Sequence, residues 1–105
     1  MKVNTSFGTY DVSLERSKYT YNDNLAIQLW CDDEGYPEPF AMLTVNLPNY
    51  GKLPENQAFV DTNNCSWAES FIKENRLGKP VGKIGISGWC EYPLYEFIEW
   101  EGELV

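Results

Sequence analysis

The chain has 105 residues, of which 43% are hydrophobic and 15% aromatic, so it can bury a core and is predicted to form one domain over residues 1–105. Sixteen acidic residues against eight basic ones give a formal net charge of −8, which argues against binding nucleic acid or an anionic membrane through a basic face. Histidine is absent, which removes the Ser–His and Cys–His pairs of nucleophilic catalysis and the commonest general base.

The sequence predicts a cytoplasmic protein that does not insert into a membrane. The opening residues, MKVNTSFGTYDV, lack the apolar stretch of a secretory signal, and no segment approaches the ~20 apolar residues of a membrane span. The cysteines, Cys31, Cys65 and Cys90, are odd in number and widely spaced, which is not a disulfide framework. We expect free thiols in a reducing cytoplasm, while one pair among the three stays open.

Strands are predicted through most of the first part of the chain. Residues 10–14, 19–21 and 25–31 alternate apolar and polar side chains, and the last of these is the clearest such pattern. The Asn-Asp-Asn cluster at 22–24 predicts a turn between the second and third strands. Trp30 then lies on the face opposite to the alternating apolar residues, either under a helix or in solvent.

An acidic turn and a central strand follow. Residues 32–35, Asp-Asp-Glu-Gly, predict a turn that residues 36–39 extend. The nearly continuous apolar run at 40–47 predicts a strand that is covered on both faces and central in the sheet. A turn over 48–51 and a short strand over 58–60 lead to the helical part of the chain.

One helix is predicted, over about 65–77. Ser66 and Glu69 have the spacing of a capping box, with Asn64 as an alternative cap. Gly78 is expected to adopt the left-handed conformation just past the last turn. The apolar residues at helical spacing are Trp67, Ala68, Phe71 and Ile72. A helix of about three turns is unstable alone, so we expect this face to pack on a sheet.

Strands are also predicted after the helix. Residues 81–88 contain three glycines and predict an irregular strand or a loop that allows close approach of another segment. Residues 92–100 predict the last strand, which Pro93 places at a sheet edge or at a strand start. The whole pattern predicts an α+β fold. We expect a mostly antiparallel sheet of about five to seven strands, with a meander first and the helix on one face.

No cofactor site or metal site is predicted. The three cysteines lack C-x-x-C spacing, and neither a P-loop nor a dinucleotide-binding fingerprint is present. The sequence therefore predicts a protein that is not an enzyme. Carboxylates are plentiful, so a metal-dependent nuclease stays an alternative if acidic side chains converge from rigid elements.

Acidic residues form two clusters without bases. From Glu91 onward there are five acidic residues and no basic one, and the second cluster begins at Asp32. If the last strand continues, alternate acids would be ~6.7 Å apart. A DNA strand carries one charge per ~3.4 Å of helix axis, so this row of acids would be a sparser version of it. Aromatic residues interleave with these acids, as in recognition surfaces. The predicted partner-binding residues are Asp32, Asp33, Glu34, Glu91, Tyr95, Glu96, Glu99, Trp100, Glu101 and Glu103. The alternative is a solubilising edge strand whose acids block edge pairing, while its aromatic residues would also permit a homodimer.

Four segments in this order, LTVNLP, LPENQAFVDTNN, WAE and YPLYEF, resemble a small uncharacterised domain family. Its members occur on conjugative elements, plasmids and prophages of Firmicutes and gut bacteria. The resemblance covers roughly residues 20–98 and brings no catalytic residues with it. It implies a small cytoplasmic protein of a mobile genetic element, a class in which acidic proteins often antagonise host defence.

We therefore expect a non-catalytic inhibitor of anti-CRISPR type. It would bind a basic nucleic-acid-handling protein, foremost a CRISPR effector nuclease, by DNA mimicry or by blocking a nucleic-acid channel, and would not contact nucleic acid itself. This expectation rests on analogy as well as on charge. A protein-binding accessory module of conjugation is the alternative function, and a metal-dependent enzyme is the third.

Overall fold

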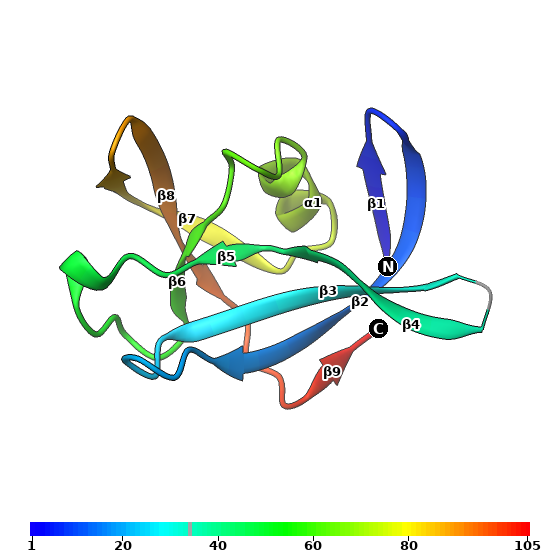
Figure 1. The fold of residues 1–105 in the computed structure, drawn as a ribbon, viewed down its shortest axis with the longest axis horizontal. Coiled ribbons are helices and arrows are strands. Elements are labelled where there is room, and N and C mark those ends of the chain that lie inside the picture. Colours follow the sequence, from blue (N-terminus) through cyan, green and yellow to red (C-terminus); the bar gives the residue numbers. More distant parts are fainter. Residues whose placement is uncertain (34) are drawn as a thin grey trace.

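The computed structural model describes residues 1–33 and 35–105, in which two antiparallel sheets and one helix enclose the main core (Figure 1). The elements are β1 (Lys2–Thr5), β2 (Gly8–Lys18), β3 (Leu25–Asp33), β4 (Tyr36–Met42), β5 (Thr44–Val45), β6 (Gln57–Val60), α1 (Ala68–Glu74), β7 (Gly78–Ser87), β8 (Cys90–Phe97) and β9 (Glu103–Leu104). The first sheet has the order β1-β2-β3-β4, with β9 also paired to β2, and the second has the order β5-β6-β8-β7. The mostly antiparallel α+β fold with one helix is confirmed, and so is the initial meander. The described residues form nine strands, so the prediction of five to seven is wrong.

The predicted central strand at 40–47 connects the two sheets. It is divided into the end of β4 and the short β5, with Leu43 between them. The Leu43 amide donates a hydrogen bond of 2.9 Å to the Ile27 carbonyl of β3, and the Leu43 carbonyl accepts one of 2.9 Å from the Asp61 amide after β6. The Thr44 hydroxyl also accepts a hydrogen bond of 3.1 Å from the Ile27 amide. This segment therefore belongs to both sheets. The prediction of a central strand covered on both faces is wrong, because β4 and β5 are end strands and only Leu43, Thr44 and Leu47 of this segment are buried.

The alternating residues of β2 and β3 supply one wall of the main core. Leu14, Ile27 and Leu29 are fully buried there, and they share the core with Phe71 and Ile72 from α1. A second, smaller cluster lies on the other face of the second sheet, since successive residues of a strand point to opposite sides. Its buried members are Leu47, Phe59, Tyr92 and Leu94.

The segment before the helix is a structural turn and lacks a capping box. The Asp61 carboxylate accepts hydrogen bonds from the Asn64 amide at 3.2 Å and from the Asn64 side chain at 2.9 Å, and the Asp61 carbonyl accepts one of 2.9 Å from the Cys65 amide. Cys65 is buried, whereas Ser66 is exposed. The N-cap position is Trp67, which has helical backbone angles, and no side chain caps it. The predicted helix 65–77 is thus too long, because turns held by Asp61 occupy its expected first residues.

The helix ends with an arginine in the left-handed conformation. Arg76 has φ of 54°, and the Leu77 amide closes the end by donating a 3.0 Å hydrogen bond to the Ile72 carbonyl, as in a Schellman motif. The prediction that Gly78 takes this place is wrong. Gly78 begins β7, where a Cβ atom would lie 2.5 Å from the Glu96 carbonyl oxygen. Glycine at 78 is therefore explained by the close approach of β8.

One predicted strand is a turn in the structure, and one predicted turn is a strand. The expected strand at 19–21 is a turn, in which the Tyr19 amide donates to the Asn24 carbonyl and the Asp23 amide to the Tyr19 carbonyl, both at 2.9 Å. The expected extension of the acidic turn at 36–39 is the start of β4. Glu34, within the predicted acidic turn, lies outside the described residues. Local pattern was the wrong guide here because strand pairing decides both segments: residues 19–21 lie in the turn between β2 and β3, and residues 36–39 pair with β3.

The last predicted strand, 92–100, is shorter and more central than expected. β8 ends at Phe97 and lies between β6 and β7, so Pro93 is not on an edge strand. Pro93 pairs with Ile84 beside a shift in register, which is a position where a missing N–H is tolerated. Among the described residues no disulfide is present, and no helix is long and apolar enough to cross a membrane.

Candidate partner-binding surface

The outer face of the first sheet carries an exposed group of acidic side chains around a tryptophan. Because alternate residues of β2 and β3 are buried in the core, the residues between them face outward. Glu15 on β2 and Asp32 on β3 are exposed, and Trp30 between them is half-buried. β9 adds Glu103, which is exposed and paired with Glu15 in the strand register. We call Glu15, Trp30, Asp32 and Glu103 the acidic sheet face.

The acidic sheet face contains one stabilising hydrogen bond and one pair of like charges. The Trp30 indole N–H donates a hydrogen bond of 3.2 Å to Glu15 Oε1, which fixes the ring over β2. Glu15 and Glu103 are directly opposite each other, a position in which Cβ atoms are about 5 Å apart and like charges are destabilising. A cation bound between these two carboxylates would remove that repulsion.

None of the three carboxylates on this face forms an ion pair within the described part of the chain. The two ion pairs there both involve Asp11, at 2.6 Å from Lys2 Nζ and at 3.9 Å from the terminal amine. The hydrogen bond from Lys2 lowers the pKa of Asp11. Lys2 and Asp11 therefore neutralise each other on β1 and β2, whereas Glu15, Asp32 and Glu103 are exposed to solvent or to a partner.

The spacing of these carboxylates suits an extended basic surface. Glu15 lies opposite Gln28 in the register, and Asp32 is four residues further along β3, so the two acids are separated by ~13 Å along the strand direction. Trp30 lies between them and offers an aromatic surface to a cationic group. Charged groups of this kind give specificity and fast association, and a central aromatic residue gives affinity.

The structure does not gather the ten predicted partner-binding residues into one surface. Only Asp32 and Glu103 belong to the acidic sheet face. Asp33 continues β3, and Glu34 lies outside the described residues. Glu91 is exposed near the turn of the β7–β8 hairpin, and this hairpin lies far along the long axis of the molecule from the β3–β4 hairpin (Figure 1).

The predicted row of acids along a continued last strand is wrong. The chain leaves β8 after Phe97 and bends at Gly102, which has φ of 66°. Glu99 accepts a hydrogen bond of 2.9 Å from the Asn56 side chain, and Glu101 is exposed beyond it. Trp100 is half-buried and packs against the main core. It supports the C-terminal segment, and its ring is not the exposed aromatic surface that was expected.

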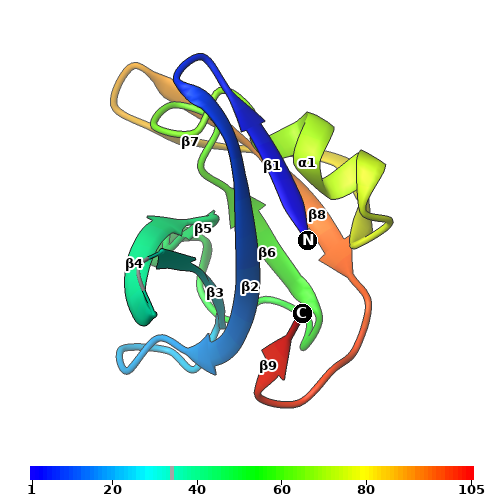
Figure 2. The same ribbon diagram turned by 90° about the vertical axis from the view of Figure 1, so that its right-hand side faces the viewer.

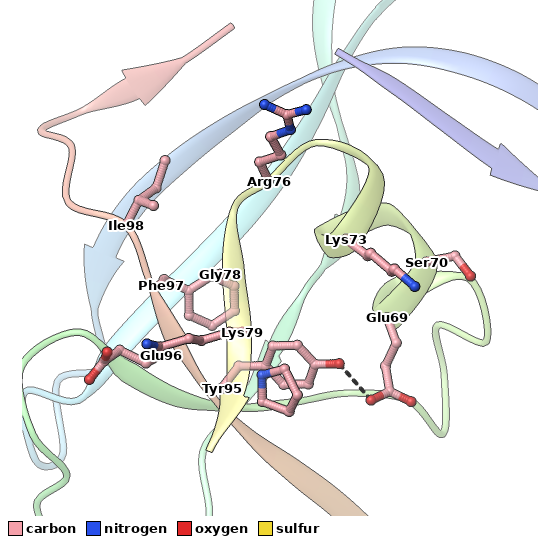
Figure 3. Close-up of a pocket in the computed structure, with 11 residues that line it drawn as sticks. Glu69, Ser70, Lys73, Arg76, Gly78, Lys79, Tyr95, Glu96, Phe97 and Ile98 are labelled. Carbon is pink, nitrogen blue, oxygen red and sulfur yellow. Dashed lines mark hydrogen bonds between the residues drawn. The ribbon is translucent and has the colours of Figure 1, made fainter. Parts of the chain in front are cut away.

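Tyr95 and Glu96 lie on opposite faces of β8. Tyr95 is buried, and its hydroxyl donates a hydrogen bond of 2.7 Å to Glu69 Oε1 on α1 (Figure 3). Burial, followed by the nearby Glu69, raises the pKa of Tyr95. Glu96 is exposed and accepts a 3.4 Å hydrogen bond from Gln57. β8 is thus no exposed aromatic edge that could pair with its own copy, because β6 and β7 cover both of its sides.

Sequence reasoning missed Glu15 and left the position of Trp30 open. The alternation of β3 identified the outward face of Trp30, but the pairing of Glu15 with residues of β3 and β9 depends on sequence separations that no local pattern reveals. Within residues 1–33 and 35–105, no group of three or more Cys, Asp or Glu side chains is arranged to hold a metal ion.

Comparison with known proteins gives a family. A family described as a domain of unknown function (DUF4313) matches residues 13–100. The chain belongs to this family. No curated protein and no solved structure matches the chain.

The DUF4313 match covers most of the acidic sheet face. It begins at Ser13 on β2, includes Glu15, Trp30 and Asp32, and ends at Trp100. Glu103 and β9 lie beyond the matched range. The opposed pair of glutamates is therefore formed between the family domain and the segment that follows it.

Proposed function

We propose that this DUF4313 protein is a non-catalytic acidic interaction protein that inhibits a host defence nuclease. Its partner would be a basic nucleic-acid-handling protein, and a CRISPR effector nuclease is the first partner to test. The observation that carries the proposal is the acidic sheet face, where three carboxylates that form no ion pair with any described residue surround Trp30. The net charge of −8 adds long-range attraction to a basic protein.

The proposed mechanism is occupation of a nucleic-acid channel. Lysine and arginine side chains that normally bind phosphates would instead bind Glu15, Glu103 and Asp32. The ~13 Å from Glu15 to Asp32 corresponds to the axial rise of about four nucleotides of a DNA strand. Trp30 would stack on a basic side chain, and a cation between Glu15 and Glu103 would relieve their repulsion.

The cellular setting belongs to the same proposal. The resemblance of residues 20–98 to proteins of conjugative elements, plasmids and prophages supports a mobile genetic element as the source. A partner that cuts invading DNA would be met in the bacterial cytoplasm. Inhibition there needs binding only, so the proposal requires no cofactor, no metal and no direct contact with nucleic acid.

The test compares two triple variants in a DNA-cleavage assay with a purified CRISPR effector nuclease. Glu15→Gln/Asp32→Asn/Glu103→Gln removes the charge of the acidic sheet face. A second variant with the same change in charge, made at Glu91, Glu96 and Glu99, is the matched control. We expect the first variant to lose inhibition by about tenfold or more and the control to retain it. Binding of the native protein should also weaken steeply as salt rises.

Three results would contradict the proposal in different ways. If only the control triple loses inhibition, β8 and the residues just after it form the binding surface and the acidic sheet face does not. If the protein co-purifies with conjugation proteins and leaves nuclease activity unchanged, the accessory role in conjugation is correct. If the purified protein itself cleaves nucleic acid when Mg²⁺ is added, it is an enzyme and not an inhibitor.

A further inference from the structure

A groove lies between α1 and the β7–β8 pair, on a different side of the molecule from the acidic sheet face. Its volume is about 930 Å³, within the range of about 300–1,000 Å³ for ligand sites. Figure 3 shows the Tyr95 ring reaching from β8 toward Glu69 on α1. Figure 2 shows α1 and β8 on one side of the molecule and β3 and β4 on the other.

The two walls of the groove differ in polarity. Glu69, Ser70, Lys73 and Arg76 recur at helical spacing and line the helix wall, while Phe71 and Ile72 face the core. The opposite wall has the apolar lining residues Pro80, Tyr95, Phe97 and Ile98, together with the charged pair Lys79 and Glu96. Gly78 contributes no side chain, so the backbone of β7 borders the groove. A ligand that fits must therefore be polar on one side and apolar on the other.

The charge of the helix wall is opposite to that of the whole protein. Lys73, Arg76 and Lys79 are three of the eight basic residues of the chain. In the described part of the chain, none of them forms an ion pair, since both ion pairs involve Asp11. Lys79 lies opposite the acidic Glu96 in the register, so Lys73 and Arg76 carry most of the available positive charge.

We propose that this groove binds an acidic, extended peptide segment of a partner protein. Its carboxylates would meet Lys73 and Arg76. Its apolar side chains would lie on the exposed Pro80 and Ile98, above the largely buried rings of Tyr95 and Phe97. The helix wall from 69 to 76 is ~10 Å long, which matches about three residues of extended chain. A long polyanion such as DNA is disfavoured, because the net charge of −8 repels it. The inference does not depend on the inhibitory role.

The probe is a fluorescein-labelled peptide of alternating glutamate and leucine, and binding is followed by fluorescence anisotropy. We expect Lys73→Glu/Arg76→Glu to weaken binding about tenfold or more, which corresponds to about 1.4 kcal/mol. Lys18→Glu/Lys83→Glu makes the same charge change outside the groove and should weaken binding much less. Ser70→Trp fills the groove from an exposed helix position without changing charge, and it should also abolish binding.

Three results would overturn the proposal. Equal binding of a peptide of alternating glutamine and leucine would show that the charge of the groove plays no part. Equal losses of binding in Lys73→Glu/Arg76→Glu and in Lys18→Glu/Lys83→Glu would show a general effect of net charge. Self-association of the native protein that Ser70→Trp abolishes would make a second copy of the chain the occupant. Circular dichroism of each variant confirms that α1 still folds.

Discussion

Removing Arg16 should loosen the C-terminal segment that presents Glu103. The half-buried Arg16 side chain leaves β2, donates 3.2 Å to the Ile98 carbonyl through Nη1 and donates through Nη2 to Asn56 Oδ1. Its Cζ atom lies 5.4 Å from the centre of the Trp100 ring. One side chain thus connects β2 with the segment before β6 and with the segment after β8. Arg16→Met keeps much of the aliphatic packing and removes these polar contacts.

The expected cost of Arg16→Met is about 2–3 kcal/mol. A hydrogen bond from a charged donor contributes about 1.5–3 kcal/mol, and a partly exposed cation–π contact about 0.5–1 kcal/mol. The bond to Ile98 is solvent-exposed, so it adds little to this sum. Arg16→Lys retains the charge but lacks the planar fork of donors, so it should lose about half as much.

Urea unfolding and hydrogen exchange measure the two parts of this prediction. Lys18→Met is the matched control, since Lys18 is exposed on the same strand and should change stability by less than about 0.5 kcal/mol. The amide of residue 16 donates 2.8 Å to the Gly102 carbonyl, so its exchange should quicken when the C-terminal segment loosens. Equal stability of Arg16→Met and Lys18→Met, or an unchanged exchange rate, would refute the reasoning.

Two other predictions concern backbone strain and thiol chemistry. Arg76→Gly should be about 1 kcal/mol more stable to urea than Arg76→Ala, because only glycine relieves the left-handed φ of 54°. At Lys73, within the helix, Lys73→Ala should instead be about 1 kcal/mol more stable than Lys73→Gly. If glycine were the more stable substitution at both positions, or alanine at both, this account would be contradicted. Burial, and then the charge of Asp61, raise the pKa of Cys65 to about 11, so iodoacetamide at pH 8 should modify the half-buried Cys90 first, as mass spectrometry can follow. The stability that Cys65 contributes is complete below its unfolded pKa of about 8.5 and is lost as pH rises toward about 11, so Cys65→Ala should flatten the loss of stability above pH 9.

The elements that local pattern predicts well are those that bury one face along their whole length. The alternation at 25–31 became β3, and the apolar positions Phe71 and Ile72 became the buried face of α1. In both cases the burial of apolar area determines the structure. The apolar run at 40–47 was expected to form one central strand, but it is divided between β4 and β5, which are end strands of their sheets and are joined through the backbone of Leu43.

Predictions from local pattern failed where a residue distant in the sequence determines the contacts of a side chain. Ser66 and Glu69 have capping-box spacing, but the Glu69 carboxylate accepts a hydrogen bond from Tyr95 on β8. The mixture of aromatic and acidic residues at 92–100 resembled an exposed edge, yet the aromatic residues of β8 are buried between two neighbouring strands. The acidic sheet face was missed for the same reason, since Glu15 meets Glu103 only through the pairing of β2 with β9.

One edge of the second sheet, formed by β7, bears on how a partner could bind. Pro80 in this strand has no N–H to offer an added strand. The register shifts between Pro80 and Ile84, which makes the edge irregular. The Tyr50 hydroxyl accepts a 2.7 Å hydrogen bond from the Ile86 amide, so that donor is already engaged. These features disfavour recognition by strand addition. Under the two proposals above, a partner would be bound by side chains, and the acidic sheet face and the groove beside α1 would allow one molecule to hold a basic surface and an acidic segment at the same time.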